Sequence, residues 1–130
     1  MSEAEHEALV RRIFAEALNR GEFAVVDEAF SPQFVDRSAP EQAVGPEGVK
    51  EYMRAVRTGF PDLHVTIEQL DAKGDLVELR ERWHGTQLGV YEGIEPAGRV
   101  VERTMLRTFR FSGGTIVEEW SAGPDLSAEP

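Results

Sequence analysis

Cysteine is absent from this 130-residue chain. Its absence excludes disulfide bridges, thiolate nucleophiles, zinc fingers and iron–sulfur clusters as explanations of fold or activity. The chain also lacks any apolar stretch of about 18 residues, and Met1 to Glu7 lacks the apolar segment of a signal peptide. We therefore expect a cytoplasmic protein that makes no contact with membranes.

Positive charge is scarce, because 14 Lys and Arg face 24 Asp and Glu, which gives a formal net charge of -10. Nucleic acids and anionic membranes attract clustered cations, so we expect neither as a partner. The length and the 41% share of hydrophobic residues fit one folded domain. We place this domain at residues 1–123 and expect a loose tail over residues 124–130.

Helical spacing dominates the first 60 residues. Ser2 and Glu5 have the spacing of a capping box and precede an apolar stripe, so we predict a helix that ends at Asn19-Arg20-Gly21. The stripe consists of Leu9, Ile13, Phe14, Ala17 and Leu18. A short helix over 23–30, a brief strand over 33–37 and a third helix from Gly45-Pro46 to Gly59 complete this half.

The hydrophobic period changes to two from residue 63 onward. This alternation predicts strands over 63–71, 76–88, 99–111 and 115–121, separated by turns rich in glycine. Helices followed by antiparallel strands indicate an α+β fold.

One carboxylate interrupts the apolar face of the second of these strands. Its odd positions carry Val77, Leu79, Glu81 and Trp83, whereas the even positions carry charged and polar residues. Successive side chains of a strand point to opposite faces, so the register that buries the apolar residues also buries Glu81.

The next strand has a similar interruption, because Arg103 and Arg107 share the parity of Met105 and Phe109. An unpaired buried charge costs several kcal/mol, so we expect Glu81 and Arg107 to pair across adjacent strands. Such a pair is either a structural salt bridge or a site where Glu81 transfers a proton and Arg107 stabilises an oxyanion.

In the last strand, parity leaves two interpretations open. Either Ile116, Glu118 and Trp120 face inward, or Val117, Glu119 and Ser121 do.

With these residues in place, the sequence resembles the SnoaL-like polyketide cyclases of the nuclear-transport-factor-2-like superfamily, over about residues 8 to 121. The resemblance is carried by residues 9–14, 27–36, 45–50, 60–63, 93–99 and 114–120, among them Phe30-Ser31-Pro32 and Gly45-Pro46-Glu47-Gly48. It implies a cone-shaped α+β barrel, with three N-terminal helices packed in a strongly curved antiparallel sheet and a pocket at the open end. It also implies that Val117, Glu119 and Ser121 face this pocket.

The chain departs from the family at several key positions. Ring-closing cyclases of the family it resembles have aspartate at the position of Ser121 and histidine at the position of Arg107. Many relatives also have histidine at the positions of Arg37 and Gln87. The remaining carboxylate–arginine–carboxylate set is similar in type to the sites of epoxide hydrolases in the same superfamily.

From residues and resemblance together we expect a cofactor-independent enzyme of cyclase, isomerase, hydroxylase or epoxide-hydrolase type, acting on an apolar polyketide-like metabolite. Its catalytic residues would be Glu81, Arg107 and Glu119. The expected substrate-binding residues are Phe14, Phe34, Arg37, Tyr52, Trp83, Gln87, Tyr91, Arg103, Met105 and Ser121. Aromatic residues at helical or strand spacing are more often core residues than ligand contacts, and this alternative applies to the aromatic members of the set.

Two further expectations concern partners. The three histidines, His6, His64 and His84, do not form a ligand cluster in the predicted elements, so no metal site is expected. Relatives commonly form homodimers, so we expect one through the outer sheet face. The alternative function is a noncatalytic ligand-binding or scaffolding domain of the same fold.

Overall fold

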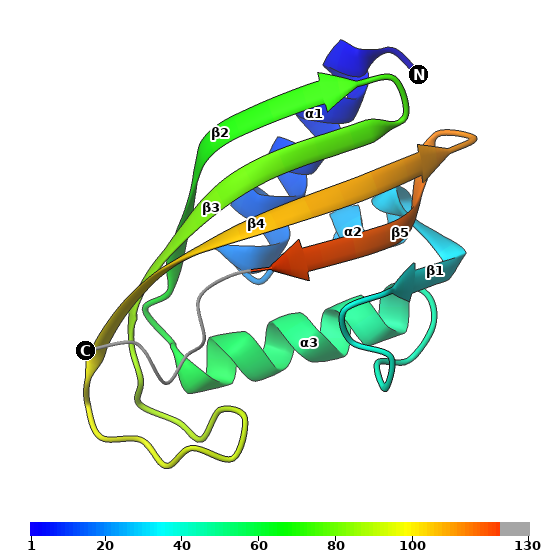
Figure 1. Cartoon of the computed structure of the whole chain (residues 1–130). Coiled ribbons are helices and arrows are strands. Elements are labelled where there is room, and N and C mark those ends of the chain that lie inside the picture. The colour runs from blue at the N-terminus through cyan, green and yellow to red at the C-terminus, as the bar shows by residue number, and fades with distance from the viewer. Residues whose placement is uncertain (123–130) are drawn as a thin grey trace.

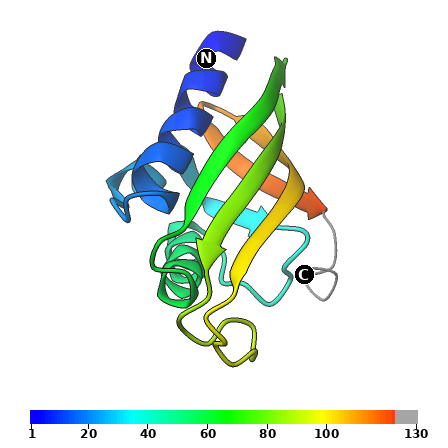
Figure 2. The same ribbon diagram turned by 90° about the vertical axis from the view of Figure 1, so that its left-hand side faces the viewer.

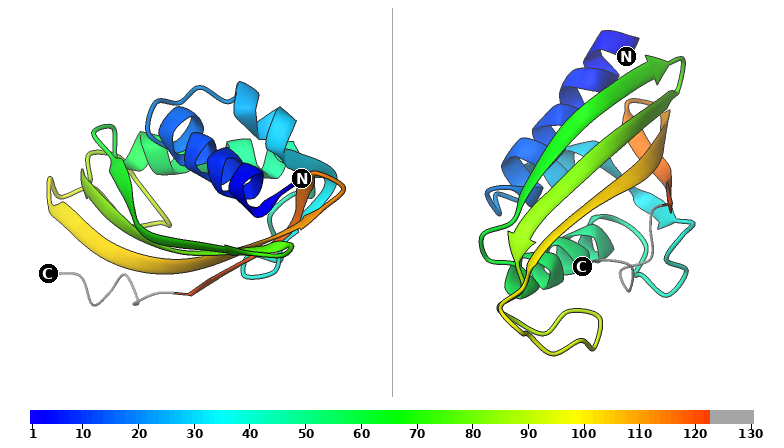
Figure 3. Two further views of the ribbon diagram at one scale, coloured as in Figure 1. Left: turned by 90° about the horizontal axis from the view of Figure 1, so that it is seen from above. Right: turned by 60° about the vertical axis from the view of Figure 1, so that its left-hand side comes forward.

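The helices lie in the hollow of a curved sheet in the computed structural model, which describes residues 1–122 (Figure 1; Figure 3, left). The first helix, α1 (Glu3–Arg12), continues directly into a π-helical segment, η1 (Ile13–Leu18). Two more helices follow, α2 (Ala24–Ala29) and α3 (Pro46–Gly59). The capping box of Ser2 and Glu5 is formed at the start of α1, as predicted.

The sheet has five strands in the order β1-β5-β4-β3-β2. Their bounds are β1 Phe30–Asp36, β2 His64–Lys73, β3 Leu76–Thr86, β4 Val100–Ser112 and β5 Thr115–Ala122. The predicted α+β fold is confirmed, and the sheet curves around the helices without closing, so β1 and β2 remain its edges (Figure 2).

The sheet is not antiparallel throughout, because β1 pairs with β5 in parallel whereas the other neighbours are antiparallel. Hydrophobic periodicity shows which residues share a face of a strand but carries no information on the direction of its neighbour. The strand β1 also begins at Phe30, three residues before the predicted start.

The core lies between the concave sheet face and the helices. The whole apolar stripe of the first helix is buried, and so is the odd face of β3, including Glu81, whose exposed fraction is 0%. Strand parity therefore assigned the burial of this carboxylate correctly.

A β-bulge in β5 decides the question that parity left open. Ile116 and Glu118 oppose the consecutive residues Phe111 and Arg110 of β4, so Val117 is an extra residue in β5. As a result Ile116 is buried on one side of the bulge and Glu119 on the other. The expected inward set is correct for Glu119, whereas Val117 is replaced by Ile116 at the buried position.

Within residues 1–122, no helix is long and apolar enough to cross a membrane. The expected tail over 124–130 lies outside the described residues.

Candidate active site

Arg107 lies between two buried carboxylates on the concave sheet face. Its Nε and Nη2 donate to Oε1 of Glu81 at 3.1 and 2.5 Å, and its Nη1 donates to Oε2 of Glu119. All three side chains are at most 7% exposed. The predicted pairing of Glu81 with Arg107 is thus present, and Glu119 extends it to a triad.

The register of the sheet explains why these residues meet. On β4, Met105 is opposite Glu81 and Phe109 is opposite Glu119, each two residues from Arg107. The two carboxylates therefore approach the guanidinium along opposite diagonals of the same face, which long side chains can span.

Burial and neighbouring charges shift the pKa values of Glu119 and Arg107. The pKa of the Glu119 carboxyl is raised to about 7, chiefly by burial and also by the carboxylates of Asp36 and Glu81, which together outweigh the lowering effect of Arg107. Burial opposes the charge of Arg107, but Glu81 and Glu119 together hold its pKa well above the usual value. Glu119 is therefore able to give up and take back a proton near neutral pH.

Asp36 belongs to this group, although it was not among the predicted site residues. It lies opposite Glu119 in the parallel pairing of β1 with β5, and its Oδ1 accepts a hydrogen bond from the backbone N–H of Ser38 at 2.9 Å. A signal was available in the sequence, since Asp36 shares strand parity with the fully buried Phe34.

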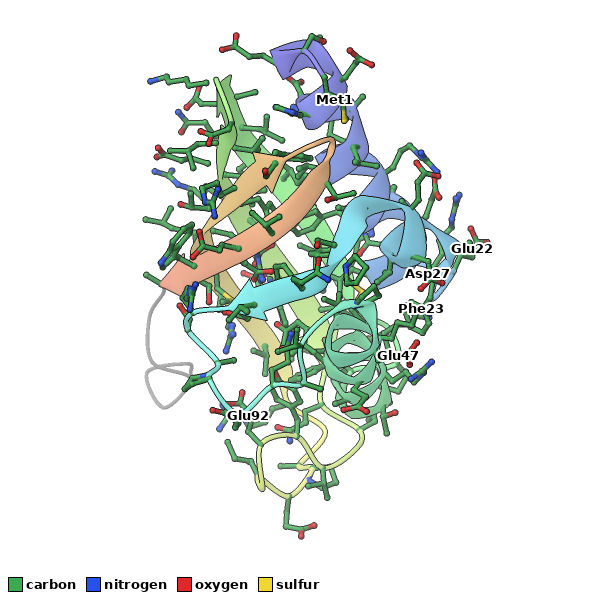
Figure 4. All side chains as sticks on the ribbon, turned by 90° about the vertical axis from the view of Figure 1, so that its right-hand side faces the viewer. Met1, Glu22, Phe23, Asp27, Glu47 and Glu92 are labelled. Atoms are coloured by element: carbon green, nitrogen blue, oxygen red, sulfur yellow. The ribbon has the colours of Figure 1, made fainter. Side chains whose placement is uncertain are left out.

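Two hollows meet at Arg107. The main cavity, of about 670 Å³, lies at the end of the sheet near α3, and Glu92 on its rim is seen in Figure 4 at the opposite end of the molecule from Met1. The deep void, of only about 20 Å³, lies between the helices and the sheet. Asp36, Tyr52 and Arg107 line both.

Most of the predicted cavity residues are brought together here. The main cavity is lined by Tyr52, Tyr91, Arg103, Met105, Arg107 and Ser121, and the deep void by Phe14, Tyr52, Arg107 and Glu119. Glu81 does not line either hollow. Its Oε2 is buried and has no hydrogen-bond partner among the described residues.

Four predicted residues are placed elsewhere. Phe34 packs in the core against Phe30, with ring centres 4.7 Å apart. Trp83 is buried beneath Arg103, whose guanidinium carbon lies 4.7 Å from the indole centre. Neither aromatic side chain lines the hollows, which agrees with the interpretation of both as core residues.

The other two residues of this group are polar. The Nε2 of Gln87 donates to the backbone carbonyls of Gly89 and Ile94, so its amide fixes the loop after β3. Arg37 is exposed and pairs through Nε with Glu118 at 2.8 Å, which also binds Arg110. Arg37 lies in the turn that follows the last residue of β1, and it lines neither the main cavity nor the deep void.

No group of three histidine, aspartate or glutamate side chains converges to hold a metal ion within residues 1–122. The polar side chains that line the two hollows include carboxylates, arginines and tyrosine hydroxyls.

Several proteins of known structure are similar to this chain over most of its length. The chain is similar to AclR, a proposed hydroxylase from Streptomyces galilaeus, with 29% identity, a TM-score of 0.81 and coverage of 95% of this chain and 91% of the other. It is also similar to a proposed SnoaL-like polyketide cyclase from a Jannaschia species, with 28% identity, a TM-score of 0.85 and coverage of 96% and 88%.

A third similar structure is IdmH, a proposed polyketide cyclase from Streptomyces antibioticus, with 27% identity, a TM-score of 0.76 and coverage of 90% of each chain. No curated protein matches the chain. The sequence pattern that describes SnoaL-like polyketide cyclases matches residues 8–129, and so the chain belongs to the SnoaL-like polyketide cyclase family.

Proposed function

We propose that the protein is an enzyme that performs acid–base chemistry on an apolar, polyketide-like metabolite with its own side chains. The observation that carries this proposal is the position of Glu119. Its carboxyl has a pKa of about 7, contacts Arg107 and lines the deep void. A proton carrier works best when its pKa lies near the working pH, so Glu119 is suited to this role.

In this proposal, Glu119 is the proton carrier and Arg107 the group that stabilises a developing oxyanion. A guanidinium has five N–H groups, of which three donate within the triad, and Arg107 also contacts the Tyr52 hydroxyl. At most one N–H group is then left for a ligand oxygen. The deep void has room for one water molecule or one small substituent beside Glu119. Glu81 acts as a positioning residue, since it binds Arg107 and does not line either hollow.

The reaction type fits several members of the family. Glu119 in its ionised form would remove a proton next to a carbonyl group, the negative charge would move to the oxygen facing Arg107, and the protonated Glu119 would return the proton to the product. Ring closure and isomerisation both need these steps. Epoxide opening would use the same residues: ionised Glu119 takes a proton from a water molecule as the water attacks a ring carbon, the C–O bond to the oxygen facing Arg107 breaks, and Glu119 returns the proton to that oxygen.

The first experiment identifies a ligand that co-purifies with the protein. Mass spectrometry of the purified protein after denaturation would detect a co-purified ligand, and ligands with carbonyl or epoxide groups would then be tested for turnover. The Glu119→Gln variant should lower turnover by about 10²–10⁴-fold. Glu118→Gln changes the adjacent carboxylate, which faces outward and binds Arg37, and is the matched control.

The second candidate is a noncatalytic ligand-binding or scaffolding domain. It is favoured by the fact that Glu81 is sealed from both hollows and bound to Arg107, as in a structural network. Under this alternative, neither the unchanged protein nor the Glu119→Gln variant would convert the ligand, and the substitution would change only stability.

We also propose that two copies associate through the outer sheet face. Leu106 and Trp120 are 54% and 38% exposed there, beside a groove of about 380 Å³ that Arg80 and Ala122 also line. Burial of this apolar surface would stabilise a dimer.

A further inference from the structure

Arg103 lines the main cavity and has no carboxylate partner in the described part of the chain, residues 1–122. Within residues 1–122 it forms no ion pair, and its buried Nε has no hydrogen-bond partner. Its Nη2 reaches only the Sδ of Met105, at 2.9 Å. Because a thioether sulfur is a weak acceptor, the donors of this guanidinium are largely unused.

The side chain of Arg103 is held in place by Trp83. The two residues are opposite each other on β4 and β3, and the guanidinium carbon lies 4.7 Å from the centre of the indole ring. Trp83 is only 2% exposed, so the ring is itself fixed in the core. Stacking on an aromatic ring orients a guanidinium and leaves its edge free to bind an anion.

Arg107 is less able than Arg103 to bind an anionic ligand group. It is already bound by two carboxylates, whose combined charge offsets its own. A ligand group that is already anionic would be repelled there by the ionised Glu81 and Glu119, whereas the oxyanion of the proposed reaction forms only as Glu119 takes up a proton and loses its charge. Of the two arginines that line the main cavity, only Arg103 is free to attract an anion.

We propose that Arg103 binds a carboxylate group of an elongated apolar ligand whose other end lies at Arg107, with a small substituent in the deep void beside Glu119. Planar, forked pairing of a guanidinium with a carboxylate is the interaction that its unused donors allow. Arg103 and Arg107 are four residues apart on one strand, which separates their Cα atoms by roughly 13 Å. This spacing fits a fused-ring acid. The inference deepens the proposed function, since it assumes that the main cavity is the ligand site.

Three carboxylates also face the main cavity. Asp36, Glu41 and Glu92 line it, and they oppose an anion. Glu41 and Glu92 are exposed to solvent, which screens their charge. Asp36 lies next to Glu119, at the end of the site assigned to the reacting group.

Isothermal titration calorimetry with two matched probes tests the proposal. Anthraquinone-2-carboxylate should bind the unchanged protein about tenfold or more tightly than anthraquinone-2-carboxamide, because only the acid forms a charged pair with Arg103. The Arg103→Gln variant should bind both probes equally. Arg20→Gln makes the same charge change at an exposed site and should retain the preference for the acid.

Equal binding of acid and amide by the unchanged protein would overturn the proposal, and so would a preference that persists in Arg103→Gln. If this variant does not fold, Arg103→Met replaces it, because its aliphatic stem keeps the packing on Trp83. Failure of the proposed function has a different signature. Turnover would then be unaffected by Glu119→Gln, whereas the preference for the acid would remain.

Discussion

Glu81 and Glu119 bind the same guanidinium from opposite sides, yet only Glu119 lines a hollow. Glu81 accepts two hydrogen bonds from Arg107 through a single oxygen, and Glu119 accepts one from Nη1. The triad therefore has a closed end at Glu81 and an accessible end at Glu119. The two carboxylates should therefore respond differently to substitution and to pH.

Replacement of Arg107 by Met should destabilise the fold. The change leaves two buried carboxyl groups without their cation, and breaking such a pair costs about 3–5 kcal/mol. Urea denaturation at neutral pH would measure the free energy of unfolding. Arg20→Met, at an exposed site, should change it by less than about 0.5 kcal/mol. A cost below about 1 kcal/mol for Arg107→Met would argue against a buried triad.

The stability of the protein should depend on pH through Glu119. Its pKa is raised in the folded state to about 7 from the usual 4.5, so the folded state favours the protonated form. The stabilisation by this proton is complete below pH 4.5 and is lost as the pH rises through 7. Between pH 5 and 8 the unchanged protein should therefore lose on the order of 1–3 kcal/mol relative to Glu119→Gln. Denaturation at several pH values would measure the free energy of unfolding of both proteins. The same pH dependence in both would contradict this prediction.

Glu81→Gln should shift the pH profile of turnover to lower pH. The carboxylate of Glu81 raises the pKa of Glu119, so its neutral replacement lowers that pKa. The variant should also lose about 1.5–3 kcal/mol of stability, because a hydrogen bond to a charged group is weakened. The ratio kcat/KM measured from pH 5 to 9 checks the shift. An unshifted pH profile would show that the charge of Glu81 does not affect the pKa of Glu119.

Leu106→Lys should weaken association of two copies through the outer sheet face. The substitution places a charge in the apolar part of the outer groove. In sedimentation velocity runs, the unchanged protein should sediment as a dimer and Leu106→Lys as a monomer. Val44→Lys alters another exposed apolar residue away from the groove and should leave the dimer intact. A monomeric unchanged protein would exclude this interface.

The sequence alone was sufficient for the local features of the fold. The capping box at Ser2 and the buried stripe of the first helix follow from spacing that one turn of a helix enforces. The pairing of Glu81 with Arg107 follows from strand alternation and from the cost of burying a lone charge. Each of these predictions depends on neighbours in the same strand or helix, or on one adjacent strand.

The tertiary structure determined features that strand alternation does not predict. The bulge at Val117 changes the inward face of β5 partway along the strand, and the parallel pairing with β1 brings Asp36 beside Glu119. The same arrangement directs Arg37 outward to Glu118 and seals Glu81 behind Arg107. Access to a cavity and the pKa of a buried carboxyl depend on charges and walls contributed by several distant segments, so only the folded chain determines which carboxylate is available to a ligand.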